Sequence, residues 1–179
     1  MTASRRMEIG LLSEHIRERL GIRDYNFNIV DVVRDTLHGN IVFFSFLDVL
    51  KGDFKEEEVV KISSERFEIR INEDNHGKRQ RFSIAHELGH LFLHMGFGRD
   101  NWDDTEVGHS YQRKTGHYTS NEEDANEFAA AFLMPEFDFR EIANETLENG
   151  RYSIKTIADK FAVSEDAVFY RGRNLQLWT

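Results

Sequence analysis

The sequence predicts an α+β fold in which helices pack against a small antiparallel sheet. Residues 66–71 (RFEIRI) alternate between charged and apolar side chains, as in a strand with one buried face. Residues 41–47 (IVFFSFL) are β-branched and aromatic, which favours a buried strand. Two long segments, 78–95 and 121–133, are expected to be helices because apolar side chains recur along them at helical spacing.

Shorter elements complete the expected order. They are helices at about 11–20 and 29–37, a strand at 59–62 that pairs with the 66–71 strand across a turn, and a polar, unpatterned surface loop at 97–120. Gly96 is placed to end the first long helix as its C′ residue. Pro135 follows the second long helix, where it cannot continue that helix. A loop as long as 97–120 is more often functional than idle.

The composition is that of an ordinary soluble globular protein, with 40% apolar and 31% charged residues in a chain of 179. No apolar run approaches the roughly 18 residues needed to span a bilayer. Residues 1–20 carry charged side chains throughout and no apolar signal segment, so we expect a cytoplasmic protein with no membrane partner. The chain contains no cysteine, so a metal ion would have to be held by His, Asp or Glu.

The segment His86-Glu87-Leu88-Gly89-His90 carries the strongest chemical signal. Two histidines four residues apart project from one face of a helix, so both imidazoles can reach one metal ion. Glu87 lies about 100° further around the helix, where its carboxylate can take a proton from the attacking water and pass it to the leaving amine. The alternative is a pair of satisfied core histidines, but burying two His and a Glu without a metal or hydrogen-bond partners is costly.

The third ligand is expected at the start of the next helix. Glu122 leads the buried face of that helix, three residues before Ala125, and is our first choice. Glu123 is the second choice, because Ser120 and Glu123 match a capping box in which the glutamate returns to the N-cap amide. An acidic helix start also has a purely structural interpretation, since carboxylates suit the positive end of the helix dipole.

Other polar residues have less certain roles. A third histidine ligand at metzincin spacing would stand at position 96, which is Gly96, so His94 is expected to support the site or the fold instead. Side chains of the polar loop are candidates to stabilise the developing oxyanion, although each has a plain surface alternative. These candidates are His109, Tyr111, His117 and Tyr118.

Two segments together resemble the ImmA/IrrE family of metallopeptidases. Residues 81–94 (RFSIAHELGHLFLH) look like the zinc helix of that family, and residues 122–135 (EEDANEFAAAFLMP) look like its second signature. The resemblance implies three zinc ligands and a catalytic base, which are His86, His90, Glu122 and Glu87. It also implies a zincin-like, gluzincin-type catalytic core and a protein substrate, a Xre-type helix-turn-helix repressor whose cleavage releases stress-response or mobile-element genes.

The C-terminal part of the chain has a different character. Residues 151–179 carry five Lys/Arg and three Asp/Glu, a local charge of +2 in a chain of net charge −9. Residues 153–175 are expected to form a helix-turn-helix-like segment with Ser164 as the N-cap of its second helix. Its expected buried positions are Ile157, Ala158, Phe161, Val163 and Val168. We therefore divide the chain into a catalytic domain at 1–145 and this segment at 146–179.

Several features weaken a DNA-reading role for this segment. Ala162 occupies a turn position that usually favours Gly, and Gly172 stands where a buried aliphatic residue would anchor the second helix. Glu165 and Asp166 would face phosphates at the start of that helix. The net charge of −9 also argues against a protein that mainly binds nucleic acid.

The sequence therefore favours a zinc-dependent, site-specific endopeptidase that acts on a regulatory protein. The alternatives are a DNA-binding regulator and a toxin–antitoxin-type regulatory protein, in which the metal site is not catalytic. We further hypothesise that the 66–71 strand, which leads into the zinc helix, offers an edge to an extended substrate by strand addition.

Overall fold

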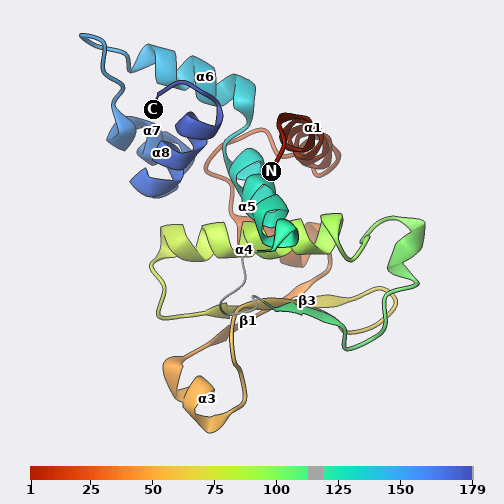
Figure 1. The fold of residues 1–179 in the computed structure, drawn as a ribbon. Helices are drawn as coiled ribbons and strands as arrows, with labels where there is room; N and C mark the ends of the chain where they lie inside the picture. Colours follow the sequence, from red (N-terminus) through yellow and green to blue (C-terminus); the bar gives the residue numbers. More distant parts are fainter. Residues whose placement is uncertain (113–118, 179) are drawn as a thin grey trace.

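A four-stranded sheet forms one layer of the structure, a computed structural model that describes residues 1–112 and 119–178 (Figure 1). The strands are β1 (Asn40–Phe44), β2 (Glu58–Lys61), β3 (Phe67–Asn72) and β4 (Ser110–Gln112), and their spatial order is β1-β3-β2-β4. The β2–β3 and β2–β4 pairs are antiparallel. With helices on the other side of the core, this arrangement confirms the α+β fold.

The sheet differs from the prediction in one pair, since β1 runs parallel to β3, with Ile41 opposite Ile69. A parallel pair needs a long connection, and residues 45–57 carry the chain past β3 to the position of β2. The same connection shortens the first strand. Ser45 forms a capping box with Asp48 and starts α3 (Phe46–Lys51), so the predicted strand at 41–47 ends at Phe44.

The zinc-helix segment forms α4 (Gly77–Leu93), which lies along one face of the sheet (Figure 1). The alternation predicted for β3 is confirmed, because Phe67, Ile69 and Ile71 are each at most 1% exposed. The helix ends slightly earlier than predicted, since its C-cap is His94 and Gly96 lies one residue beyond the C′ position, with a left-handed φ of 75°. The sheet and these apolar side chains thus fix the face that α4 buries.

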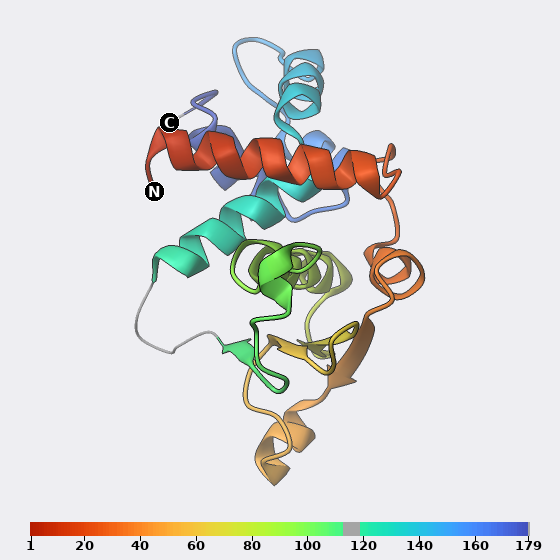
Figure 2. The ribbon, with the colours of Figure 1, turned by 90° about the vertical axis from the view of Figure 1, so that its right-hand side faces the viewer.

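Two further helices cover α4 on the side away from the sheet. α5 (Ser120–Leu133) crosses α4, and α1 (Ala3–Arg19) lies across α5 (Figure 2). The connection from α1 to β1 contains α2 (Ile29–Asp31) and the π-helical turn η1 (Val32–Thr36). The described part of the segment predicted as a loop at 97–120 contains two regular elements, the 3₁₀ turn η2 (Asp100–Trp102) and the strand β4, which pairs with β2.

The C-terminal helices are α6 (Glu136–Glu145), α7 (Ile154–Phe161) and α8 (Glu165–Asn174). The last two confirm the predicted helix–turn–helix, and Ser164 caps α8 by accepting a hydrogen bond from the Ala167 amide. The five predicted buried positions are buried. Ala162 takes the left-handed conformation of the turn (φ 53°), which glycine adopts more readily.

The unexpected Gly172 has a packing reason. A Cβ at this position would lie only 1.9 Å from the ring of Trp178, so the glycine leaves space for the indole of the chain's own C-terminal segment. Buried residues of α7 and α8 belong to the same hydrophobic cluster as those of α4 and α5. Among the described residues, no helix is both long enough and apolar enough to cross a membrane.

Candidate metal centre

The two helices α4 and α5 bring three potential ligands to one buried point. Nε2 of His86 lies 3.1 Å from Nε2 of His90, and both histidines come from adjacent turns of α4. Glu122, in the first turn of α5, directs one carboxylate oxygen to each ring, at 3.4 Å from His86 and 3.2 Å from His90. These three residues are 1–6% exposed. They form the group that could hold a metal ion.

Close packing of the helices explains how Glu122 reaches the histidines. Gly89 lies between the two histidines in sequence, and a Cβ there would meet the backbone of Ala125 at 3.0 Å and the side chain of Phe128 at 3.2 Å. Such separations are tighter than ordinary contacts, so the glycine lets α5 approach α4 along this face. A larger residue would push the carboxylate of Glu122 away from the two imidazoles.

The second nitrogen of each imidazole has its own partner. Nδ1 of His86 lies 2.9 Å from Oδ1 of Asn126, an oxygen that can only accept, so His86 donates through Nδ1 and leaves the lone pair of Nε2 for a metal. Nδ1 of His90 lies 2.9 Å from Nδ1 of His94. Burial lowers the pKa of His94 to about 4, so this ring is neutral at pH 7 and can accept the hydrogen bond.

The donor set fits a divalent metal. Two imidazole nitrogens and the two oxygens of one carboxylate face one another, and a cation between them would offset their mutual repulsion. Ligands about 2.1 Å from a tetrahedral zinc ion would be about 3.4 Å apart, close to the observed separations of 3.1–3.4 Å. Two imidazoles and one carboxylate, with no thiolate, form a ligand set that zinc uses in catalytic sites.

Glu87 occupies the next position on α4 after His86 and is 4% exposed. It belongs to the same helical turn as the two histidines but not to the group of converging ligand atoms. A buried carboxylate beside a metal site, outside the ligand set, is suited to proton transfer. This is the placement that the sequence predicted for a base.

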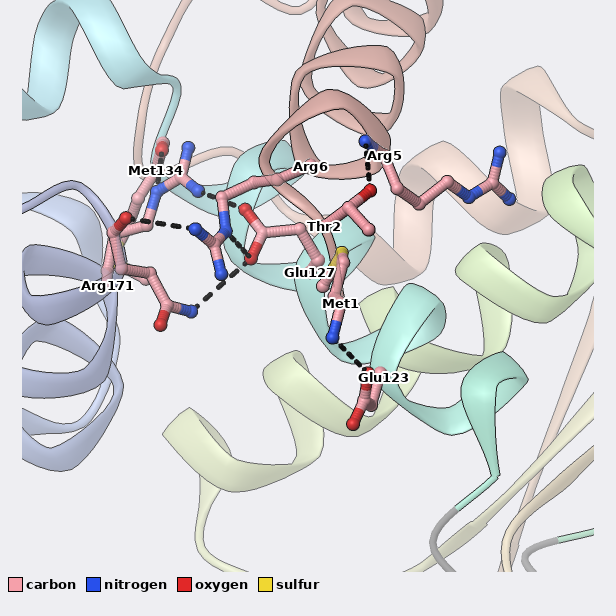
Figure 3. Close-up of polar contacts among 9 residues, drawn as sticks. Met1, Thr2, Arg5, Arg6, Glu123, Glu127, Met134 and Arg171 are labelled. Carbon is pink, nitrogen blue, oxygen red and sulfur yellow. Dashed lines mark hydrogen bonds and ion pairs between the residues drawn. The ribbon is translucent and has the colours of Figure 1, made fainter.

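The two candidate glutamates of α5 have different partners. Glu122 faces the histidines, whereas Oε2 of Glu123 accepts a hydrogen bond from the Met1 ammonium at 2.8 Å (Figure 3). The predicted capping box is wrong, because the N-cap is Thr119 and no side chain caps the helix. The carboxylate of Glu123 points towards Met1, which precedes α1, and does not bind the backbone amide at the start of α5.

The charged residues near the start of α1 also hold α5. Nε and Nη2 of Arg5 lie 2.8 and 2.6 Å from one oxygen of Asp124. Nε of Arg6 lies 3.3 Å from Glu127, which also pairs with Arg171 of α8 at 2.7 Å (Figure 3). These contacts hold α5 against α1 and α8.

The proposed oxyanion donors have mixed outcomes. His109 is exposed, and its backbone carbonyl accepts a hydrogen bond from the Lys61 amide. Tyr111 lies in β4, opposite Val59 of β2, so its backbone is part of the sheet. His117 and Tyr118 lie outside the described residues. Of these four candidates, His109 has a described side chain, and it is not part of the group of converging ligands.

The edge-strand hypothesis for residues 66–71 is wrong. β3 lies between β1 and β2, so both of its edges already form backbone hydrogen bonds. The outer strands among the described residues are β1 and β4.

Asn126 is the site residue that the sequence reasoning did not single out. It stands four residues after Glu122, and therefore on the same face of α5, which is the signal that could have identified it. His94 stands four residues after His90 on α4 in the same way. Each supporting residue thus follows a ligand by one helical turn.

An α+β fold, a His-Glu-x-x-His helix and a glutamate from the following helix together define the class of gluzincin-like metallopeptidase folds. The Peptidase M78 family model, described as the IrrE N-terminal-like domain, matches residues 46–172, and the chain belongs to this family. This match confirms the resemblance found from the two sequence segments.

Among solved structures, the chain is similar to a Mycobacterium tuberculosis transcriptional regulator, with a TM-score of 0.60 and 18% identity. The match covers 95% of this chain and 47% of that one, so the chain spans about half the length of the regulator. At this level of identity the likeness supports the fold alone. A comparison with curated proteins found no match.

Proposed function

We propose that this protein is a zinc-dependent endopeptidase that cleaves a regulatory protein at a specific site. The observation that carries the proposal is the convergence of His86, His90 and Glu122, whose ligand atoms lie 3.1–3.4 Å apart in a buried position. Membership of a peptidase family supports hydrolysis of peptide bonds as the chemistry.

Each residue of the site has a role in this proposal. His86, His90 and Glu122 would hold the zinc ion. When bound, zinc would polarise the scissile carbonyl and lower the pKa of water from 15.7 towards about 7. Glu87 takes a proton from the attacking water and delivers it to the leaving amine. Asn126 and His94 hold the two imidazoles in the orientation that keeps their Nε2 atoms towards the ion.

The proposed substrate is a helix-turn-helix repressor of the Xre type. Its support is the family resemblance and the charge of this chain, which is −9 and would attract a basic DNA-binding protein. Cleavage of such a repressor would release stress-response or mobile-element genes. Oxyanion stabilisation is assigned to the loop that contains His109 and Tyr111, with His117 and Tyr118 as the other candidates from the sequence.

The direct test is co-expression with a helix-turn-helix repressor encoded beside this gene. We expect repressor fragments with the wild type, and a loss of cleavage of about 10²- to 10⁴-fold with Glu87→Gln. Zinc content should stay stoichiometric in this variant. Glu136→Gln, an exposed position on α6 outside the candidate site, should cleave normally. A purified wild type without zinc, or unchanged cleavage by Glu87→Gln, would contradict the proposal.

DNA reading by α8 is the alternative function for the C-terminal segment. Arg171 of α8 is 3% exposed and paired with Glu127, so its charge is not presented to phosphates. This contact supports a structural or partner-binding role for the segment. A steeply salt-dependent shift of duplex DNA by the purified protein would favour DNA binding instead.

A further inference from the structure

A cavity of about 650 Å³ lies between the C-terminal segment and the helices of the metal site. Its walls come from the starts of α1 and α4, from α5 and from α8. The volume falls in the range of roughly 300–1,000 Å³ typical of ligand sites. The uncharged lining residues include Phe82 of α4, Asn126 and Ala130 of α5, and Ala167 and Tyr170 of α8.

The cavity is continuous with the surroundings of the metal site. Asn126 lines it and also holds Nδ1 of His86 at 2.9 Å. Phe82 stands one helical turn before His86 on α4, and Glu123, another lining residue, directly follows Glu122. Asn126 and the ring of His86 therefore connect this cavity to the candidate metal centre.

One part of the cavity lining is a cluster of paired charges. Arg6, Glu127 and Arg171 line it together, and Glu127 pairs with both arginines, at 3.3 Å and 2.7 Å (Figure 3). Arg171 also donates to the carbonyl of Met134. Both arginines are therefore held by partners within the protein, and the cluster keeps one positive charge in excess.

The remaining surface suits a peptide with an apolar side chain. Apolar groups make up most of the exposed lining, including the rings of Phe82 and Tyr170. Charges of both signs stand around them, with Lys78 and Arg79 on α4 and Asp166 on α8. A few polar groups around an apolar interior are typical of sites that hold an organic ligand in one orientation.

We propose that this cavity is a specificity subsite for the protein substrate, in which an apolar side chain close to the scissile bond packs between Phe82 and Tyr170. The inference rests on the proposed peptidase function and deepens it. It assigns the helix-turn-helix-like segment a role as one wall of the substrate site, with α8 contacting the substrate rather than DNA.

The test uses zinc-loaded full-length protein and small hydroxamates as probes. The hydroxamate group anchors each probe at the metal, and the probes differ only in one side chain, which is glycine, leucine or phenylalanine. In one series the variable side chain lies on one side of the hydroxamate, and in the other series it lies on the opposite side. Affinities are measured by calorimetry, so the readout does not depend on catalysis.

We expect the leucine and phenylalanine probes of one series to bind about 10- to 100-fold more tightly than the glycine probe, because an apolar side chain is buried. Ala167→Trp and Ala130→Leu, which fill the cavity from α8 and from α5, should each remove this gain. Neither change should alter zinc content or the affinity of the glycine probe. Two filling variants are used so that the test remains possible if one of them does not fold.

A matched pair of substitutions on α8 distinguishes an effect of the cavity lining from a general effect on the helix. Tyr170 and Phe169 are adjacent aromatic residues, 61% and 40% exposed, and Tyr170 lines the cavity whereas Phe169 does not belong to its lining. Tyr170→Ala should reduce the gain from the apolar side chain by about tenfold, and Phe169→Ala should leave it unchanged.

Three results would overturn the inference while leaving the peptidase proposal intact. These are equal affinity of all probes for the zinc-loaded wild type, an apolar gain that survives both filling variants, and equal effects of Tyr170→Ala and Phe169→Ala. A protein that binds no zinc would instead overturn the proposed function, and the subsite with it.

Discussion

Two buried polar clusters share helix α5, and they differ in how their charges are balanced. Towards α4, Glu122 meets His86 and His90, and the two nitrogens and two oxygens that converge can each offer a lone pair. Towards α8, Glu127 meets Arg171, and the pair is 1% and 3% exposed at its side chains. The first cluster could hold a cation from outside the chain, whereas the second contains its own.

This difference distinguishes a site from a structural contact. A buried carboxylate paired with a guanidinium at 2.7 Å is complete and fixes the position of a helix. A buried carboxylate aimed at two imidazoles, whose other nitrogens already have partners, is arranged for a metal. Burial of polar groups is common to both clusters, and the complementarity of the partners separates them.

The largest expected effect is on metal binding at the first cluster. Glu122→Ala removes one of three ligands, so zinc affinity should fall by more than the roughly 10- to 100-fold typical of outer contacts. Zinc content after dialysis should drop from stoichiometric to background. Glu123→Ala, at the neighbouring position, should retain zinc. Loss of zinc in Glu123→Ala but not in Glu122→Ala would reverse the assignment of the two glutamates.

Substitutions in the second cluster should change the stability of the fold rather than the affinity for zinc. Glu127→Ala leaves the guanidinium of Arg171 buried without its carboxylate, which should lower the free energy of unfolding by about 3–5 kcal/mol. Urea denaturation measures this change. Glu136→Ala breaks the exposed pair with Arg140 and should cost about 0.3–0.5 kcal/mol. Equal losses of unfolding free energy in the two variants would show that the buried pair contributes no more to stability than the exposed one.

The hydrogen bond from His86 to Asn126 offers a finer test of the first cluster. Asn126→Ala removes the acceptor and should weaken zinc binding by about 10- to 100-fold, without the complete loss expected at Glu122. Asn126→Asp keeps an oxygen acceptor at the same place and should bind zinc close to the wild-type affinity. Competition with a chromogenic chelator measures both. Similar weakening by both variants would argue against an orienting role.

The smallest effect concerns His94 in the metal-free protein. Burial lowers its pKa from 6.5 to about 4, so folding favours the neutral ring. Stability from this group is therefore complete above pH 6.5 and is lost as the pH falls from 6.5 to about 4. The loss should be about 1–2 kcal/mol, because solvent screens the partly exposed ring. The Tm of His94→Asn should fall less over this range, and identical pH profiles would refute the assignment.

Local patterns predicted the long helices α4 and α5 and the strands β2 and β3, but not α3, β4 or α6. The alternation in residues 66–71 predicted the buried face of β3, and Ser164 marked a helix start that the structure confirms. These features depend on a few neighbouring residues, so they can be inferred without knowledge of the fold. The strand at 41–47 was too long because the competing capping box of Ser45 and Asp48 was not recognised.

The spacing of residues in the sequence was enough to predict that His86 and His90 lie on one face of a helix, with Glu87 beside them. A four-residue spacing on one helix places both imidazoles on one face, whatever else the helix contacts. The same local rule, together with the family resemblance, indicated metallopeptidase chemistry. These conclusions need only the geometry of α4.

The choice between Glu122 and Glu123 as the residue that contacts the histidines required the packing of the helices. Glu122 and Glu123 are adjacent on α5, and the choice depends on how that helix packs against α4 at Gly89 and against α1 at Met1. The position of β3 inside the sheet, the partner of Glu127 and the role of Asn126 were decided in the same way. Each joins residues far apart in the chain, and their contacts are set by packing between elements rather than by spacing within one.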